Sequence, residues 1–431
     1  MALRAWKEKN SAQQSLVFLQ ALLREYHPRD FAVELWDGTR WEPEPNQFRR
    51  FDWKINRPGG LRAAFREPSQ LALAEAYIYR HFDLEGDLAG VFPLADYLLS
   101  HEWSKKEKLR LMAMWVALPR TDDLHPLRPG TRLSGRLHSK DRDRQAVRYH
   151  YDVSNDFYSL WLGKEMAYSC AYFIKPEDDL NTAQEQKLDY ICRKLRLKPG
   201  ERLLDIGCGW GSLIIHAARN YGVEALGITL SEQQLALTKR RIVEAGLADR
   251  CEARLLDYRE VESAAWYDKL VSIGMVEHVG EANLLQYFQR AYRLLRPGGV
   301  FLNHGIGVPE NRPKPKGPNF VDLYVFPDGE FVPIGTMMRA AEQAGFEVRD
   351  VENLREHYAL TCGHWVRGME EHAEEARRLV DEVTYRIWRL QMAGSEYYFR
   401  RGWLDLYQTL LVKSEQGQSG LPLTRADWYA G

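Results

Sequence analysis

The sequence lacks the features that would place it outside the ordinary globular proteins. Its 431 residues hold five cysteines, and no two of them have the C-x-x-C spacing of a zinc site or suggest a disulfide framework. No run approaches the roughly 18 apolar residues of a membrane-spanning helix. The N-terminal stretch has no uninterrupted apolar core of the signal-peptide type. We therefore expect a reduced, intracellular protein without a metal site, which would act on a membrane only from outside the bilayer.

An excess of charge of one sign is also missing. The 59 Lys and Arg residues nearly balance the 60 Asp and Glu residues, and a net charge of -1 does not suggest a nucleic-acid-binding protein. Aromatic residues, in contrast, are abundant at 12%, with 13 Trp and 22 Tyr. A packed core, an interface and a ligand pocket would each use them, so composition leaves that choice open.

Residues 1–118 predict a smaller α+β domain. Alternating runs at 31–35 and 51–55 predict strands, and Asp37-Gly38 supplies a hairpin turn after the first of them. Helical patterns cover 15–26, 71–88 and 104–119.

Residues 119–148 are rich in Pro, Gly, Ser and charge, and we interpret them as a basic linker. From Arg128 to Arg148, seven Lys or Arg residues stand against Asp141 and Asp143, a local balance of +5. A solvated tether and a segment attracted to anionic lipid head groups both fit this composition.

Residues 149–431 predict an α/β domain with a doubly wound, mostly parallel sheet. Five candidate strands alternate with amphipathic helices such as 231–246 and 283–295. The strands are expected at 202–207, 223–229, 251–257, 268–274 and 298–307. Ligands of such sheets bind outside the carboxyl ends of the strands. Glu277 follows the fourth candidate strand at such an end.

The first of these strands runs into the loop DIGCGWGSL. Gly207, Gly209 and Gly211 would let the backbone approach a ligand at the start of a helix. The dinucleotide fingerprint requires a glycine at the position of Ser212, so a nicotinamide or flavin cofactor is disfavoured. Together with Asp205, the loop resembles the first motif of the class I S-adenosylmethionine-dependent methyltransferases, which have a Rossmann-like fold.

Several further segments resemble one family within that class. YDVSNDFYSLWL, MAYSCAYF, GMVEHVG and LNHGIG, spread over roughly residues 149–410, are similar to the cyclopropane-fatty-acyl-phospholipid synthases and the mycolic acid cyclopropane synthases. The resemblance implies that the methyl group of S-adenosylmethionine is added to a cis double bond of a phospholipid acyl chain. The resulting carbocation would lose a proton and close to a cyclopropane ring, and a bound bicarbonate ion would serve as the base.

The same resemblance assigns the site residues. Bicarbonate would be held by the side chains of Glu277, His304 and Tyr358 and by main-chain contacts of Cys170 and Ile306. The remaining residues would bind the cofactor: Tyr168, Ser169, Asp205, Gly207, Gly209, Gly211, Thr229, Gln234, Asp257 and Tyr258. Because the second strand ends without an acid, Thr229 and Gln234 would contact the ribose as neutral groups. Some family members have a cysteine where Ser395 stands, so we assign no covalent role to that position.

The N-terminal domain favours a membrane phospholipid over a carrier-bound chain, because it resembles the corresponding part of the phospholipid-acting enzymes. The resemblance also implies a homodimer, placed in the cytoplasm and peripherally associated with the inner face of the membrane. Alternatives stay open: a methyl-branching enzyme that forms a methylene group, an amine N-methyltransferase, or a lipid sensor without catalysis. A nucleic-acid methyltransferase lacks support in both charge and motif.

Overall fold

The computed structural model describes residues 2–67, 69–120, 130–262, 264–312 and 319–429. The chain divides into two compact units. The small unit comprises Met1–Thr131, Pro315–Val325 and Asp381–Tyr397, and the large unit comprises Arg132–Lys314, Phe326–Val380 and Tyr398–Gly431. Two C-terminal pieces therefore join the small unit, which the predicted boundaries at 118 and 148 did not include.

The small unit is built on a four-stranded sheet in the order β2-β1-β3-β4. Its strands are β1 (Phe31–Leu35), β2 (Arg40–Trp41), β3 (Phe51–Ile55) and β4 (Phe82–Gly86). The predicted hairpin is present, because β1 pairs with β2 antiparallel. The predicted helix at 71–88 is wrong in its second half: Phe82 and Leu84 alternate inward and pair with β3 as strand β4.

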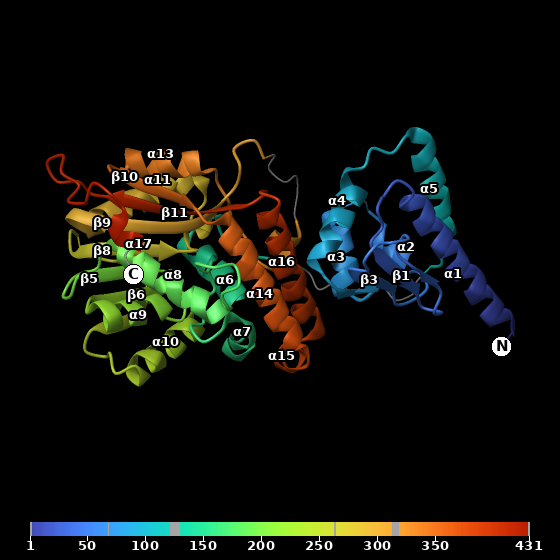
Figure 1. Cartoon of the computed structure of the whole chain (residues 1–431), viewed down its shortest axis with the longest axis horizontal. Coiled ribbons are helices and arrows are strands. Elements are labelled where there is room, and N and C mark those ends of the chain that lie inside the picture. The colour runs from blue at the N-terminus through green and yellow to red at the C-terminus, as the bar shows by residue number, and fades with distance from the viewer. Residues whose placement is uncertain (1, 68, 121–129, 263, 313–318, 430–431) are drawn as a thin grey trace. The chain divides into compact units, whose positions relative to one another are not determined.

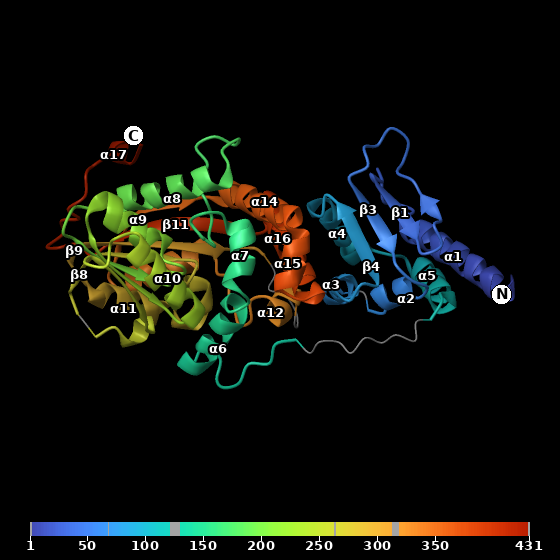
Figure 2. The ribbon, with the colours of Figure 1, turned by 90° about the horizontal axis from the view of Figure 1, so that it is seen from below.

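Helices complete the small unit. Helices α1 and α5 lie side by side (Figures 1 and 2). The unit contains α1 (Ala2–Leu22), α2 (Gly60–Ala64), α3 (Gln70–Ile78), α4 (Phe92–Ser100), α5 (Lys105–Ala117), α12 (Phe320–Tyr324) and most of α16 (Glu382–Arg400). Arg386 of α16 donates to the backbone oxygens of Tyr77 and Phe82 at 2.8 and 2.9 Å. These contacts hold the late piece of chain in this unit.

The large unit contains a seven-stranded sheet in the order β10-β11-β9-β8-β5-β6-β7. The five predicted strands are present as β5 (Arg202–Ile206), β6 (Glu224–Thr229), β7 (Cys251–Leu255), β8 (Tyr267–Ile273) and β9 (Leu295–Gly307). Two further strands, β10 (Glu347–Asn353) and β11 (Asp405–Val412), extend it, and β11 runs antiparallel to both of its neighbours. The sheet is therefore mostly parallel, as predicted.

Helices cover both faces of this sheet, which confirms the doubly wound architecture (Figure 1). Helices α8 (Leu180–Leu195), α9 (Ser212–Tyr221) and α10 (Glu232–Glu244) share one face with Leu203, Leu302 and Leu410. Helices α11 (Leu284–Leu294) and α13 (Ile334–Gln343) share the other face with Leu204, Phe301 and Leu411. Successive strand residues thus alternate between two apolar layers, as a sheet covered on both faces requires.

The segment predicted to be a linker is partly helical. Helix α6 (Lys140–Tyr151) begins inside it and belongs to the large unit, followed by α7 (Asn155–Leu162). The remaining helices of this unit are α14 (Arg355–Glu371), α15 (Ala373–Leu379) and α17 (Ala426–Tyr429). Within the described part of the chain, no helix combines the length and the apolar character needed to span a bilayer.

Candidate active site

The glycine loop between β5 and α9 takes backbone conformations that favour glycine. Gly207, Gly209 and Gly211 have φ of 88°, 53° and 82°. Gly207 and Gly209 line a cavity at the carboxyl ends of the strands. Gly211 is instead the N-cap of α9, and a Cβ there would stand 2.5 Å from Cγ2 of Thr238. Gly211 therefore permits close packing of α9 against α10.

The cavity gathers the predicted cofactor residues. All of them except Gly211 line it, and they come from separate segments of the chain: Tyr168, Ser169, Asp205, Gly207, Gly209, Thr229, Gln234, Asp257 and Tyr258. Their convergence places the cavity where ligands of doubly wound sheets bind.

Two uncharged side chains, Thr229 and Gln234, form a hydrogen-bonded pair at the end of β6. The Thr229 hydroxyl donates to Oε1 of Gln234 at 2.7 Å, and both side chains are buried. The backbone N–H of Gln234 donates to the hydroxyl of Ser231, the N-cap of α10. The bond between the Thr229 and Gln234 side chains thus holds them together before any ligand arrives.

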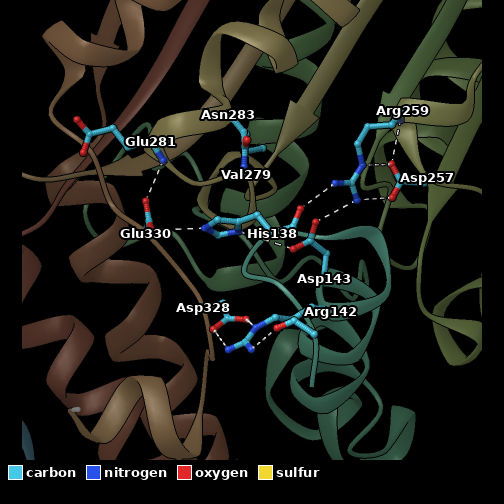
Figure 3. Close-up of polar contacts among 11 residues, drawn as sticks. His138, Arg142, Asp143, Asp257, Arg259, Val279, Glu281, Asn283, Asp328 and Glu330 are labelled. Atoms are coloured by element: carbon cyan, nitrogen blue, oxygen red, sulfur yellow. Dashed lines mark hydrogen bonds and ion pairs between the residues drawn. The ribbon is translucent and has the colours of Figure 1, made fainter. Parts of the chain in front are cut away.

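Asp257 at the end of β7 is engaged by Arg259. Nε of Arg259 donates to Oδ1 of Asp257 at 2.9 Å, and the same guanidinium lies 3.0 Å from Oδ2 of Asp143 in α6 (Figure 3). Sequence reasoning missed Asp143 and Arg259, although both line the cavity. Asp257 therefore also anchors α6 through Arg259.

Ion pairs attach the rest of this segment to the large unit. Lys140 lies 2.9 Å from Glu260. Arg142 lies 2.5 Å from Asp328, and His138 lies 3.4 Å from Glu330 (Figure 3). Arg148 pairs with Glu232. Several cations of the predicted basic linker thus neutralise acids of the protein itself, whereas Arg132 and Arg136 remain exposed. Arg128 lies outside the described residues.

Helix α8 presents a polar stripe to the sheet. Gln184, Lys187 and Lys194 are each 1% exposed. Nζ of Lys187 donates to the Ser169 hydroxyl at 3.0 Å, and burial lowers its pKa to about 8. Sequence reasoning missed these lysines, because charged residues on an amphipathic helix usually face solvent. Lys187 lines the cofactor cavity.

Asp205 is a buried carboxyl group at the end of β5. Its Oδ1 has no hydrogen-bond partner among the described residues. Burial raises its pKa to about 7, and nearby Lys187 opposes that shift. An unpartnered buried oxygen facing a cavity is a place for a ligand donor.

Glu277 lies in a short turn, Val276–His278, directly after β8. Its Oε1 accepts a hydrogen bond from the Ile306 backbone N–H at 2.7 Å, whereas its buried Oε2 has no partner within the described ranges. Burial raises the pKa of Glu277 to about 7. The strand therefore delivers a carboxyl group that is partly protonated near neutral pH.

His304 lies on β9, two residues before Ile306 and on the same face of the strand. Its Nδ1 lies at hydrogen-bond distance, 3.2 Å, from Nε2 of Gln408, and its buried Nε2 has no partner in the described structure. Burial, together with the charges of Lys187 and Lys194, lowers its pKa to about 3. His304 is therefore a neutral imidazole, which carries a proton on only one of its two ring nitrogens.

The other predicted bicarbonate residues lie nearby. Tyr358 on α14 packs against Phe399 and Trp365, at ring distances of 4.6 and 5.8 Å. Burial, then Cys362, Tyr168, Cys170 and Glu277, raises its pKa. Cys170 is buried, and burial raises the pKa of its thiol, which makes the sulfur a poor nucleophile. None of the five predicted bicarbonate residues lines the cofactor cavity itself.

Aromatic rings surround Tyr168 at the edge of the cavity. The rings of Trp365, Trp161 and Tyr151 lie 5.1, 5.6 and 6.2 Å from it. Such faces stabilise a cation without forming a bond to it. Ser395, in contrast, lies in α16 within the small unit and accepts a hydrogen bond from Gln391.

The sequence of this chain is similar to a known enzyme family and to individual enzymes. The family described as mycolic acid cyclopropane synthetase matches residues 138–409. A probable fatty acid methyltransferase of Pseudomonas putida is 41% identical over 401 residues, which cover 92% of this chain and 95% of that protein. The tuberculostearic acid methyltransferase of Mycobacterium tuberculosis is 35% identical over 343 residues, 75% of this chain and 79% of that one.

A solved structure has the same fold. The mycolic acid cyclopropane synthase CmaA1, complexed with SAH (S-adenosylhomocysteine) and CTAB, superposes with a TM-score of 0.59 at 32% identity. The match covers 62% of this chain and 97% of that one.

Proposed function

The chain belongs to the mycolic acid cyclopropane synthetase family of the S-adenosylmethionine-dependent methyltransferases, and we propose that it cyclopropanates unsaturated acyl chains of phospholipids. The observation that carries this proposal is the arrangement of Glu277, Ile306 and His304. Two buried polar atoms, Oε2 of Glu277 and Nε2 of His304, lack partners within the described ranges. They suit a small anion that accepts hydrogen bonds.

The cofactor cavity suits S-adenosylmethionine. The amino-acid end of S-adenosylmethionine carries an ammonium group and a carboxylate. The Asp205 carboxylate would bind the ammonium group, and the Lys187–Ser169 pair would bind the carboxylate. Thr229 and Gln234 would bind the ribose hydroxyls, and Asp257 and Tyr258 would flank the adenine. When bound, S-adenosylmethionine supplies an electrophilic methyl group, and bicarbonate supplies the base.

An ionised Glu277 would repel a bound anion, and protonation of its carboxyl group would remove this repulsion. Because Oε1 accepts from Ile306, the proton of the neutral acid belongs on Oε2. With a pKa of about 7, Glu277 would donate from Oε2 to bicarbonate near neutral pH. His304 would donate from Nε2. Two neutral donors would thus hold the anion, and Tyr358 would add a third.

The aromatic wall suits the reaction that follows. Methyl transfer to a double bond leaves a carbocation, which reacts with any strong nucleophile in contact with it. The rings of Tyr168 and Tyr151, which line the cavity, would exclude such nucleophiles and stabilise the positive charge. One proton would then leave the transferred methyl group toward the base, and the electrons of that C–H bond would form the new bond to the cationic carbon and close the ring.

Helix α5 supports a phospholipid membrane as the source of substrate. Leu109, Met112 and Val116 share one face of the helix and are 70%, 63% and 55% exposed. Its exposed cations are Lys105, Lys106, Lys108 and Arg110. Exposed apolar residues with flanking cations are typical of helices that lie in an anionic membrane surface.

The function is tested in a bacterial host that lacks its own cyclopropane synthase. Gas chromatography and mass spectrometry of the membrane lipids separate a cyclopropane ring from a methylene branch of equal mass. We expect a cyclopropane product that disappears with Glu277→Ala. A methylene-branched product would instead support the alternative, methyl branching, which the similarity to a tuberculostearic acid methyltransferase favours. Unchanged lipids would contradict both.

Membrane binding is tested by sedimentation with phosphatidylglycerol vesicles. We expect the double variant Leu109→Ser, Met112→Ser to bind less than the wild type. Val243→Ser is the matched control, because Val243 is 68% exposed on α10 of the large unit. Equal binding of all three proteins would rule out α5 as the membrane contact. The homodimer stays a prediction, which sedimentation velocity will test.

A further inference from the structure

A row of polar side chains crosses three strands of the large sheet beside the proposed anion site. Glu352 on β10 pairs in register with Gln408 on β11, and Gln408 pairs in register with His304 on β9. Residues in register on neighbouring strands point to the same face of the sheet. The row therefore places Gln408 between an acid and the imidazole.

Lys194 of α8 lies over this row. Its Nζ donates to Oε1 of Gln408 at 2.9 Å and also to Glu352. A buried ammonium group is stable only when it is paired, and Asp350, 3.8 Å from the same Nζ, adds a second carboxylate. Burial lowers the pKa of Lys194, but Glu352 and Asp350 oppose that shift, and the ammonium group that they stabilise is a hydrogen-bond donor only.

The ammonium group determines how the Gln408 amide is oriented. Since Lys194 has no acceptor, the amide oxygen must face Lys194, and the amide NH2 must face His304. The NH2 can donate only to a nitrogen that carries no proton. Nδ1 of His304 is therefore the bare nitrogen, and the imidazole proton is on Nε2.

We propose that Lys194 and Gln408 are positioning residues that hold His304 as the Nε2–H tautomer, so that it donates to the anion beside Glu277. In the opposite tautomer, a lone pair on Nε2 would face the anion and repel it. The inference deepens the proposed function and rests on it for the identity of the anion as bicarbonate. The tautomer itself is a property of the ligand-free protein.

The tautomer is measured by imidazole nitrogen NMR on the full chain with labelled histidine. The His304→Asn spectrum identifies the resonances of His304. We expect wild-type His304 to carry its proton on Nε2, and Gln408→Glu to move a proton onto Nδ1, because a carboxylate accepts where the amide donated. A wild-type proton on Nδ1, or an unchanged tautomer in Gln408→Glu, would overturn the proposal.

The consequence for the anion is measured as the bicarbonate concentration that gives half-maximal turnover on unsaturated phospholipid vesicles. Gln408→Met fills the same space and cannot donate. Losing an oriented donor to an anion should raise that concentration about 10- to 100-fold. S-Adenosylmethionine affinity should stay within about twofold of wild type, since Gln408 does not line the cofactor cavity.

Thr409→Val is the matched control. Thr409 is buried on the same strand, but its hydroxyl donates to the Asn303 backbone oxygen at 3.2 Å on the other face of the sheet. The variant also loses one buried hydrogen bond, yet it should leave the bicarbonate requirement unchanged. Equal increases in Thr409→Val and Gln408→Met would show general destabilisation and overturn the proposal.

Lys194→Met provides a second comparison. Without the ammonium group, the Gln408 amide can rotate, so both His304 tautomers should be populated in the NMR spectrum. A spectrum identical to the wild type would remove Lys194 from the proposal. Wild-type turnover on vesicles that did not depend on bicarbonate would contradict the proposed function. The NMR spectra would still show whether Lys194 and Gln408 hold His304 as the Nε2–H tautomer.

Discussion

Asp205 and Glu277 are two buried carboxyl groups at the ends of neighbouring strands, β5 and β8, and they differ in what surrounds them. Burial raises the pKa of each to about 7, and each has one oxygen without a partner among the described residues. Asp205 lies in the electrostatic range of a cation, Lys187, and faces the open cofactor cavity. Glu277 has a backbone N–H on one oxygen and lies outside that cavity.

The difference indicates that two carboxyl groups whose pKa is raised to the same value can have different roles. Asp205 would act as a carboxylate that accepts from a cationic ligand, whereas Glu277 would act as a neutral acid that donates to an anion. The role of each carboxyl group depends on the ligand group that its unpartnered oxygen would contact. Four predictions would break or sharpen this comparison.

Removing the Glu277 carboxyl should have the largest effect. With Glu277→Ala, one donor to the anion is lost, and turnover on unsaturated phospholipid should fall by about 10²- to 10⁴-fold. Calorimetry should find S-adenosylmethionine affinity within about twofold of wild type, because Glu277 does not line the cofactor cavity. A large loss of affinity instead would place Glu277 in the cofactor site.

Asp205→Asn should affect the cofactor site and not the anion site. Replacing the carboxylate that would meet the cofactor ammonium should remove a charged hydrogen bond, so the dissociation constant of S-adenosylmethionine should rise about 10- to 100-fold in calorimetry. At saturating cofactor, the bicarbonate concentration for half-maximal turnover should equal that of the wild type. If that concentration rose in parallel, the two carboxyl groups would belong to one site.

The two sites should respond to pH with opposite signs. Glu277 donates only while protonated, so the affinity for bicarbonate should be constant below pH about 7 and fall about tenfold per pH unit above it. Asp205 accepts only while ionised, so cofactor affinity should rise about tenfold per pH unit up to pH about 7 and then level off.

Variants that cannot titrate are the controls for this pH dependence. Glu277→Gln keeps a donor at the same place, so its bicarbonate requirement should not vary between pH 6 and pH 9, from about one unit below to about two units above the shifted pKa of Glu277. Asp205→Asn should likewise flatten the cofactor profile. Profiles of the same sign for both ligands would contradict the assigned roles.

Thr229→Val should have the smallest effect. The hydroxyl fixes the Gln234 side chain through a bond of 2.7 Å, and losing a neutral hydrogen bond should weaken cofactor binding about two- to tenfold. Turnover at saturating cofactor and the bicarbonate requirement should both equal the wild-type values. A change in the bicarbonate requirement would mean that β6 also shapes the anion site.

Local patterns were sufficient to predict much of the large unit. Strand–helix alternation identified β5 to β9, and the predicted cofactor residues converge on one cavity except for Gly211, whose role is packing. The predicted roles of Glu277 and His304 remain to be tested, although the structure leaves on each the unpartnered atom that such a role needs.

The other residues around the site could not be predicted, because contacts between distant parts of the chain give them their roles. Gln408 lies on an antiparallel strand far along the chain, and only its register with His304 gives it a place at the site. Lys187 and Lys194 occupy positions that a helical pattern assigns to solvent, because local sequence does not show that their charges are compensated in the core. The charged run at 140–148 resembled a tether because its acidic partners lie in other segments.

The most direct test of the account is turnover of purified enzyme on unsaturated phospholipid vesicles, with and without bicarbonate, in buffer freed of carbon dioxide. Gas chromatography of the products would accompany the assay. We predict that a cyclopropane product forms only when bicarbonate is present, and that Glu277→Ala stays at least about 10²-fold slower at every bicarbonate concentration that saturates the wild type. Equal rates with and without bicarbonate would contradict the account.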